Sequence, residues 1–138
     1  MEPLLCRAMK TLAFVLSLFC LMTMFASAAD SSAKRGKLVH FVAFKYKKAI
    51  TEEKKNEVAK ALVALKGKIP EIMSVEWGTN VSQEGFDKGF HQAFVITFAN
   101  EKDRDLYLVH PEHKKFAKLL DGIIADKGVF VFDFVSKE

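Results

Sequence analysis

Residues 129–135 read Val-Phe-Val-Phe-Asp-Phe-Val, a run of β-branched and aromatic residues that is typical of a strand. Successive side chains of a strand point to opposite faces of the sheet. Three phenylalanines therefore share one face and three valines share the other: Phe130, Phe132 and Phe134 against Val129, Val131 and Val135. A sheet with one face in water usually alternates apolar and polar residues. We therefore expect both faces of this sheet to be covered.

Two other segments repeat this two-sided pattern. Residues 38–46 (LVHFVAFKY) and residues 90–99 (FHQAFVITFA) are strand-like and apolar on both faces. Their opposed sets are Val39, Phe41 and Ala43 against Leu38, Val42 and Phe44, and Phe94, Ile96 and Phe98 against Ala93 and Val95. Residues 72–81 predict a further strand, and the polar residues 82–89 predict a loop.

Helical patterns separate these strands. Thr51 is a candidate N-cap, and the residues at helical spacing after it are Val58, Leu62, Leu65 and Ile69. A second helical region covers residues 101–109 and is renewed at Pro111, and we expect it to end at Gly128. The order β-α-β-β-α-β predicts an α+β, ferredoxin-like fold. In that fold an antiparallel four-stranded sheet carries its helices on one face.

The second apolar face of the sheet needs a cover. Left bare, it would exceed the apolar patches of about 300–600 Å² that monomers usually expose. A second copy of the same sheet is the simplest cover, because a two-fold interface is self-complementary. A ligand or lipid surface, or a different partner protein, are the alternatives. We therefore predict a homodimer through the open sheet face.

The first 28 residues have the pattern of a secretory signal peptide. Arg7 and Lys10 precede the apolar stretch 12–25, and Ala26-Ser-Ala28 then offers small residues for cleavage. An uncleaved membrane anchor is the alternative, and translation could also start at Met9. We predict a signal peptide at 1–28, a flexible linker at 29–36 and one domain at 37–138. The mature protein would be secreted or periplasmic, with no membrane attachment after cleavage.

Composition excludes several classes of function. Both cysteines, Cys6 and Cys20, fall within the predicted signal peptide, so the mature chain has no disulfide and no thiolate metal site. The net charge is only +4 and the lysines are interspersed with acids, which argues against nucleic-acid binding. No phosphate-binding glycine loop and no nucleophile elbow occur. We predict no cofactor and no metal.

Few residues could carry chemistry. His40 lies within the first strand, and Tyr107 and His113 bracket the break between the helical segments. Histidine titrates near neutral pH, so a His40–Tyr107–His113 cluster could transfer protons. His110 and His113 are three residues apart and could bind a metal together, but His110 fits a helix-entry residue better because Pro111 follows it.

The motifs Trp77-Gly-x-Asn-Val-Ser82 and Tyr107-x-x-His-Pro-x-His113 resemble the stress-responsive A/B barrel (Dabb) family. The resemblance covers about residues 38–135, and includes the strand 40–46. It implies a dimeric α/β barrel in which two ferredoxin-like sheets close face to face. Most members of that family are stress-associated proteins without an assigned reaction.

A plant branch of the family is a polyketide cyclase that needs neither metal nor cofactor. The resemblance places its tyrosine and histidine at Tyr107 and His113, with His40 as a further candidate catalytic residue. It also implies pocket positions at Leu62 and Gln92, where the cyclase has tyrosine and histidine, and Trp77 is a third candidate binding residue. This sequence therefore departs from the cyclase at two pocket positions.

Two classes of function remain open. The first is a barrel that binds a small apolar molecule without a reaction, and the second is a cofactor-free cyclase, lyase or monooxygenase-like enzyme that uses a Tyr/His acid–base pair. A cavity that joins His40, Tyr107 and His113 and opens to solvent would favour chemistry. A filled core there would exclude it.

Overall fold

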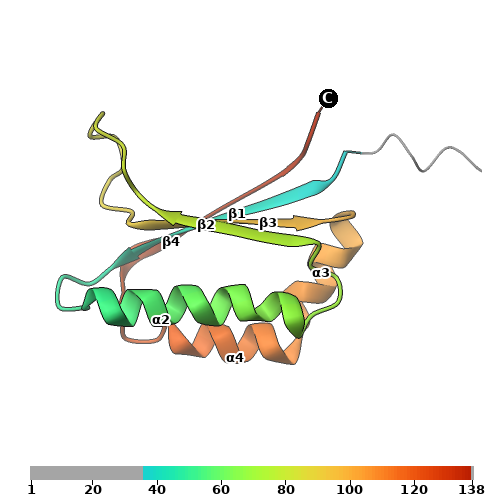
Figure 1. The fold of residues 1–138 in the computed structure, drawn as a ribbon, viewed down its shortest axis with the longest axis horizontal. Helices are drawn as coiled ribbons and strands as arrows, with labels where there is room; N and C mark the ends of the chain where they lie inside the picture. Colours follow the sequence, from blue (N-terminus) through green and yellow to red (C-terminus); the bar gives the residue numbers. More distant parts are fainter. Residues whose placement is uncertain (1–35, 138) are drawn as a thin grey trace, which may run out of the picture. The chain divides into compact units, whose positions relative to one another are not determined.

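The computed structural model describes residues 36–137, and the predicted signal peptide lies outside the described residues. The elements follow in the order β1 (Leu38–Tyr46), α2 (Glu52–Val63), the short 3-10 helix η1 (Ala64–Gly67), β2 (Ser74–Thr79), β3 (Gln92–Phe98), α3 (Glu101–Val109), α4 (Pro111–Leu119) and β4 (Ile124–Val135). Helices α2, α3 and α4 lie on one side of the sheet (Figure 1). The predicted ferredoxin-like α+β fold is confirmed.

The four strands form one sheet in the order β2-β3-β1-β4. All three neighbouring pairs are antiparallel, so β2 and β4 are the two free edges. The largest buried side chains project toward the helices, with Phe94, Ile96 and Phe98 of β3 fully enclosed. Val58 and Leu62 of α2 are packed in the same core. One continuous core therefore lies between the sheet and the helices.

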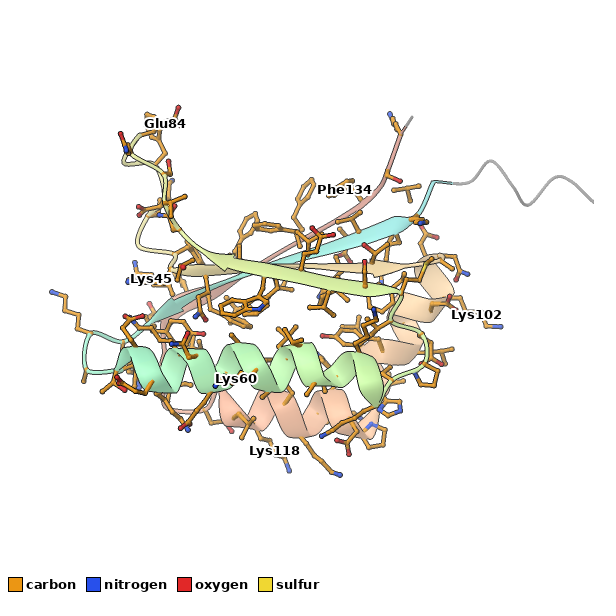
Figure 2. All side chains as sticks on the ribbon, in the orientation of Figure 1. Lys45, Lys60, Glu84, Lys102, Lys118 and Phe134 are labelled. Atoms are coloured by element: carbon orange, nitrogen blue, oxygen red, sulfur yellow. The ribbon has the colours of Figure 1, made fainter. Side chains whose placement is uncertain are left out.

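The opposite face of the sheet is apolar, and no other part of residues 36–137 covers it. Phe130, Phe132 and Phe134 are each about half exposed, and register pairs Phe132 with Phe41 of β1. Figure 2 shows Phe134 on the side of the sheet that faces away from the helices. The prediction of strands that are apolar on both faces is confirmed.

Side chains at the helix starts explain where the helices begin. The Thr51 hydroxyl accepts a hydrogen bond from the Lys54 backbone N–H, and Asn100 does the same for Asp103 at the start of α3. His110 caps α4, because its Nδ1 accepts from the Glu112 backbone N–H at 3.2 Å and Pro111 takes the first helical position. The prediction of His110 as a helix-entry residue is confirmed.

The prediction for the end of the second helical region was wrong. Helix α4 ends at Leu119, and β4 begins at Ile124 rather than Val129. Gly128 lies inside the strand, where a bulge shifts the register between β1 and β4. A Cβ at Gly128 would sit 2.5 Å from the Lys45 carbonyl oxygen, so the glycine permits a close approach of two backbones rather than ending a helix.

Within residues 36–137 no helix is long and apolar enough to cross a membrane. The same residues contain no cluster of three or more His, Cys, Asp or Glu side chains arranged to hold a metal ion.

Candidate functional site

A cavity of about 370 Å³ lies between the sheet and the helices. Its polar lining consists of His40, Tyr107, His113 and Asp133, and the rest is apolar side chain from β1, α2, α3, α4 and β4. The cavity opens at the β4 edge, where the lining side chains of Val129 and Val131 are 49% and 50% exposed. Its volume falls in the range of small-molecule pockets, about 300–1,000 Å³. The three predicted catalytic residues therefore share one solvent-accessible cavity.

His113 projects from the first turn of α4 into this cavity and is half buried. Its Nδ1 lies 3.1 Å from the Leu108 carbonyl oxygen, and a carbonyl can only accept a hydrogen bond. Nδ1 therefore carries the proton, which leaves the lone pair on Nε2. Burial, together with repulsion from His40, lowers the pKa of His113 against the opposing effect of the Leu108 hydrogen bond. The imidazole is thus a neutral base at neutral pH.

Tyr107, on the last turn of α3, lies between the two histidines. Its ring centroid is 4.3 Å from that of His113 and 5.9 Å from that of His40. The side chain is almost completely buried, and this burial raises the pKa of its hydroxyl. Tyr107 therefore stays protonated at physiological pH and can serve as a hydrogen-bond donor.

His40 is held by a carboxylate that the sequence analysis missed. Its Nδ1 lies 2.5 Å from Oδ1 of Asp133, the residue directly opposite on β4. The other carboxylate oxygen accepts a hydrogen bond from Arg104 of α3. This Arg104–Asp133–His40 chain fixes the imidazole in position. A signal for Asp133 existed, because strand alternation places it on the face of Val129 and Val131 and not with the phenylalanines.

The three predicted binding residues do not lie in one cavity. Leu62 of α2 lines the same cavity as His113. Gln92 is fully buried and accepts a hydrogen bond from the Tyr46 hydroxyl at 2.7 Å, but does not line that cavity. Trp77, on the edge strand β2, stacks on Phe94 with ring centroids 6.0 Å apart. Gln92 and Trp77 instead border a second hollow, of about 450 Å³, beside Phe41 on the uncovered face.

Residues 38–136 match the family described as the stress responsive A/B barrel domain (Dabb). The chain belongs to this family. An olivetolic acid cyclase from Cannabis sativa is 28% identical over 99 residues, which cover 72% of this chain and 96% of the cyclase. The stress-response A/B barrel domain-containing protein HS1 of Arabidopsis thaliana is 30% identical over 100 residues, covering 72% of this chain and 90% of HS1.

A solved structure of another protein has a similar fold. A dimeric protein of unknown function with a ferredoxin-like fold, from Bacteroides fragilis, superposes with a TM-score of 0.59. It is 27% identical, and the match covers 73% of this chain and 97% of that one.

Proposed function

We propose that this Dabb protein binds a small apolar carbonyl compound in the 370 Å³ cavity and catalyses proton transfer on it without a cofactor. The observation that carries the proposal is the solvent-accessible cavity that His40, Tyr107 and His113 line together. A barrel that only stores an apolar molecule has no need for a base with a fixed tautomer and a lowered pKa at its wall.

The chemistry starts from the free lone pair of His113. Nε2 removes a proton from a carbon next to the substrate carbonyl, and the electron pair of that C–H bond moves onto the carbonyl oxygen to give an enolate. The Tyr107 hydroxyl, which burial keeps protonated, donates a hydrogen bond to this oxygen. The proton held by His113 then returns to the product, and the base is restored.

The lining of the cavity defines the substrate class. Its apolar part includes Leu62, Phe116 and Leu120, which favour a ring or a short hydrocarbon chain. Among the described residues that line it, no lysine or arginine is present to hold a carboxylate or a phosphate. We therefore favour an uncharged compound, such as a small aromatic ketone.

The similarity to an olivetolic acid cyclase supports an enzyme, because that relative is named for a ring-forming reaction. This chain has Leu62 in its cavity and Gln92 outside it, where the resemblance implies a tyrosine and a histidine. Its acid–base groups are therefore confined to the His40–Tyr107–His113 end. We propose a simpler proton transfer than that of the cyclase, on a different substrate.

Binding is tested by filling the cavity from its wall. Ala117 of α4 lines the cavity, whereas Lys118 points away from the sheet (Figure 2). An A117W variant should lose the NMR chemical-shift changes that acetophenone induces in the wild type, and K118W should keep them. Equal responses of the two variants would show that the ligand binds elsewhere.

We also propose that two copies associate through the uncovered sheet face. Support comes from the phenylalanine row of β4 and from the dimeric relative. Stacked sheets lie about 10 Å apart, so the side chains of two such faces would interdigitate as in a sandwich. This arrangement would remove both apolar faces from water.

Export remains a proposal that depends on the sequence of residues 1–28. If the signal peptide is cleaved after Ala28, the protein recovered from outside the cytoplasm begins at Ala29. Mass spectrometry of the intact mature chain measures this directly. A chain that still carries residues 12–25 would instead support the membrane anchor.

A further inference from the structure

Residues 80–91, between β2 and β3, form an arm that rises on the side of the sheet away from the helices. Figure 2 shows Glu84 near the tip of this arm. The arm is held by its own hydrogen bonds: the Ser82 N–H donates to Asn80 Oδ1 at 2.8 Å, and Asn80 Nδ2 donates to Asp87 Oδ2 at 2.9 Å. The Gly89 N–H donates to the same carboxylate at 2.6 Å. These hydrogen bonds within the arm indicate an ordered loop.

This arm carries two apolar side chains in solvent. Val81 is 87% exposed and Phe86 is 80% exposed, the two highest values among the large apolar residues of the described chain. An ordered loop that holds a phenylalanine ring and a valine side chain in solvent offers an apolar contact to another surface.

An uncovered apolar rim exists at the mouth of the cavity. Val129 and Val131 lie on the helix-facing side of β4, yet half of each side chain is exposed because β4 is a free edge. Val129 also lines the apolar end of the cavity, together with Leu120. The cavity is therefore incomplete at its β4 side in a single copy.

The sheet register places the arm and the rim at the same end of the sheet. Thr79, the last residue of β2, pairs with Gln92, Gln92 pairs with Phe44, and Phe44 pairs with Val129. One row across the sheet thus runs from the base of the arm at one free edge to the rim at the other. The β2 and β4 edges also run antiparallel to each other, which suits edge-to-edge pairing.

Two copies joined through their uncovered faces bring these features together. A two-fold axis parallel to the strands places the β2 edge of one copy beside the β4 edge of the other and keeps each row at its own level. In that arrangement the arm, which points toward the partner, would pass the partner's β4 edge and reach the helix-facing side of the partner's sheet at the level of its Val129.

We propose that the arm of each subunit closes the cavity of the other, with Phe86 of the partner subunit packed on Val129 at the mouth. The inference depends on the dimer proposed above and assigns to the partner one wall of the ligand site. A monomer would therefore bind apolar ligands in a cavity that is open on one side.

Disulfide trapping tests this contact in the full chain. The only cysteines, Cys6 and Cys20, are first replaced by serine, and F86C is then combined with V129C. Mild oxidation should give a covalent dimer on a non-reducing gel, because a disulfide forms only where the two Cβ atoms come within about 4.5 Å. The F86C single variant, and F86C combined with K60C at an exposed position of α2, should give roughly tenfold less covalent dimer.

Sedimentation and ligand binding separate the possible failures. A dimer without the F86C–V129C cross-link would overturn the proposed contact and leave the dimer intact. A protein that sediments as a monomer would overturn both the proposed contact and the proposed dimer. A cross-linked F86C–V129C dimer, together with a wild-type dimer that does not bind acetophenone, would uphold the contact and refute the proposed function. In the F86S variant, a dimer whose acetophenone affinity falls about tenfold would support the arm as a wall of the site, and an unchanged affinity would refute that role.

Discussion

Asp133 accepts hydrogen bonds from His40 and from Arg104, so replacing it tests the polar framework of the site. Its Oδ1 lies 2.5 Å from His40 Nδ1, and its other oxygen accepts from Arg104. The His40 side chain is 6% exposed and that of Asp133 is 25% exposed. A D133N variant keeps the shape and one acceptor oxygen but removes the charge and turns one oxygen into a donor that faces a donor.

The expected loss follows from the burial. Hydrogen bonds to charged groups contribute about 1.5–3 kcal/mol each to stability. Because Asp133 is partly exposed, we expect the His40–Asp133 hydrogen bond to lie in the lower part of this range. We expect D133N to lower the free energy of unfolding by about 2 kcal/mol. Urea unfolding followed by the fluorescence of Trp77, the single tryptophan, measures this difference.

A matched control uses the same arginine. Asp105 accepts a hydrogen bond from Arg104 Nε at 2.7 Å, but its side chain is 65% exposed. Exposed ion pairs contribute about 0–1 kcal/mol, so D105N should have a small effect. Similar losses for D105N and D133N would refute the structural importance of the His40–Asp133 bond.

Three further predictions follow from the pKa, the open face and the bulge. Proton exchange catalysed by the protein should decrease as the pH falls through the pKa of His113, because only the neutral imidazole is a base. The midpoint of this decrease should lie below the ordinary histidine pKa of about 6.5. A pH–rate profile measures the midpoint, and a value above about 6.5 would contradict the lowered pKa. An F132D variant should sediment as a monomer at a concentration where the wild type is a dimer, because a stacked face cannot bury the charge; a persistent dimer would place the interface elsewhere. A G128A variant should lose about 1–3 kcal/mol of stability, because its Cβ would collide with the Lys45 carbonyl oxygen. The control G67A, with no atom near its added Cβ, should change stability by less than about 0.5 kcal/mol. Thermal unfolding compares the two variants, and equal unfolding midpoints would refute the steric explanation.

Much of the fold could be predicted because local patterns and tertiary packing agree. The β-branched and aromatic composition of residues 38–46 predicted the bounds of β1 correctly. The break at Pro111 was likewise visible, because proline favours the first turn of a helix. The start of β4 was not predictable in this way. Ile123 and Ile124 continue a helical pattern, and only pairing with Tyr46 of a distant strand draws Ile124 into the sheet.

The candidate site could be predicted only in part. The family motif identified Tyr107 and His113, and His40 was a strand residue that could lie beside them. Asp133 could have been found from strand alternation, but nothing local indicates that Arg104 reaches across to it from α3. The cavity itself depends on how α4 packs over the sheet, which no sequence period specifies.

The proposed reaction requires that His113 is a base with a free Nε2 in a cavity that accepts small carbonyl compounds. Exchange of the methyl protons of acetophenone for deuterium in D₂O, followed by proton NMR, measures that proton transfer without requiring knowledge of the natural product. We expect the wild type to accelerate exchange over buffer, H113A to abolish the acceleration, and H91A, which alters an exposed histidine outside the cavity, to retain it. Acetophenone that binds in the cavity with no exchange above buffer, or with the same exchange in H113A, would contradict the claim.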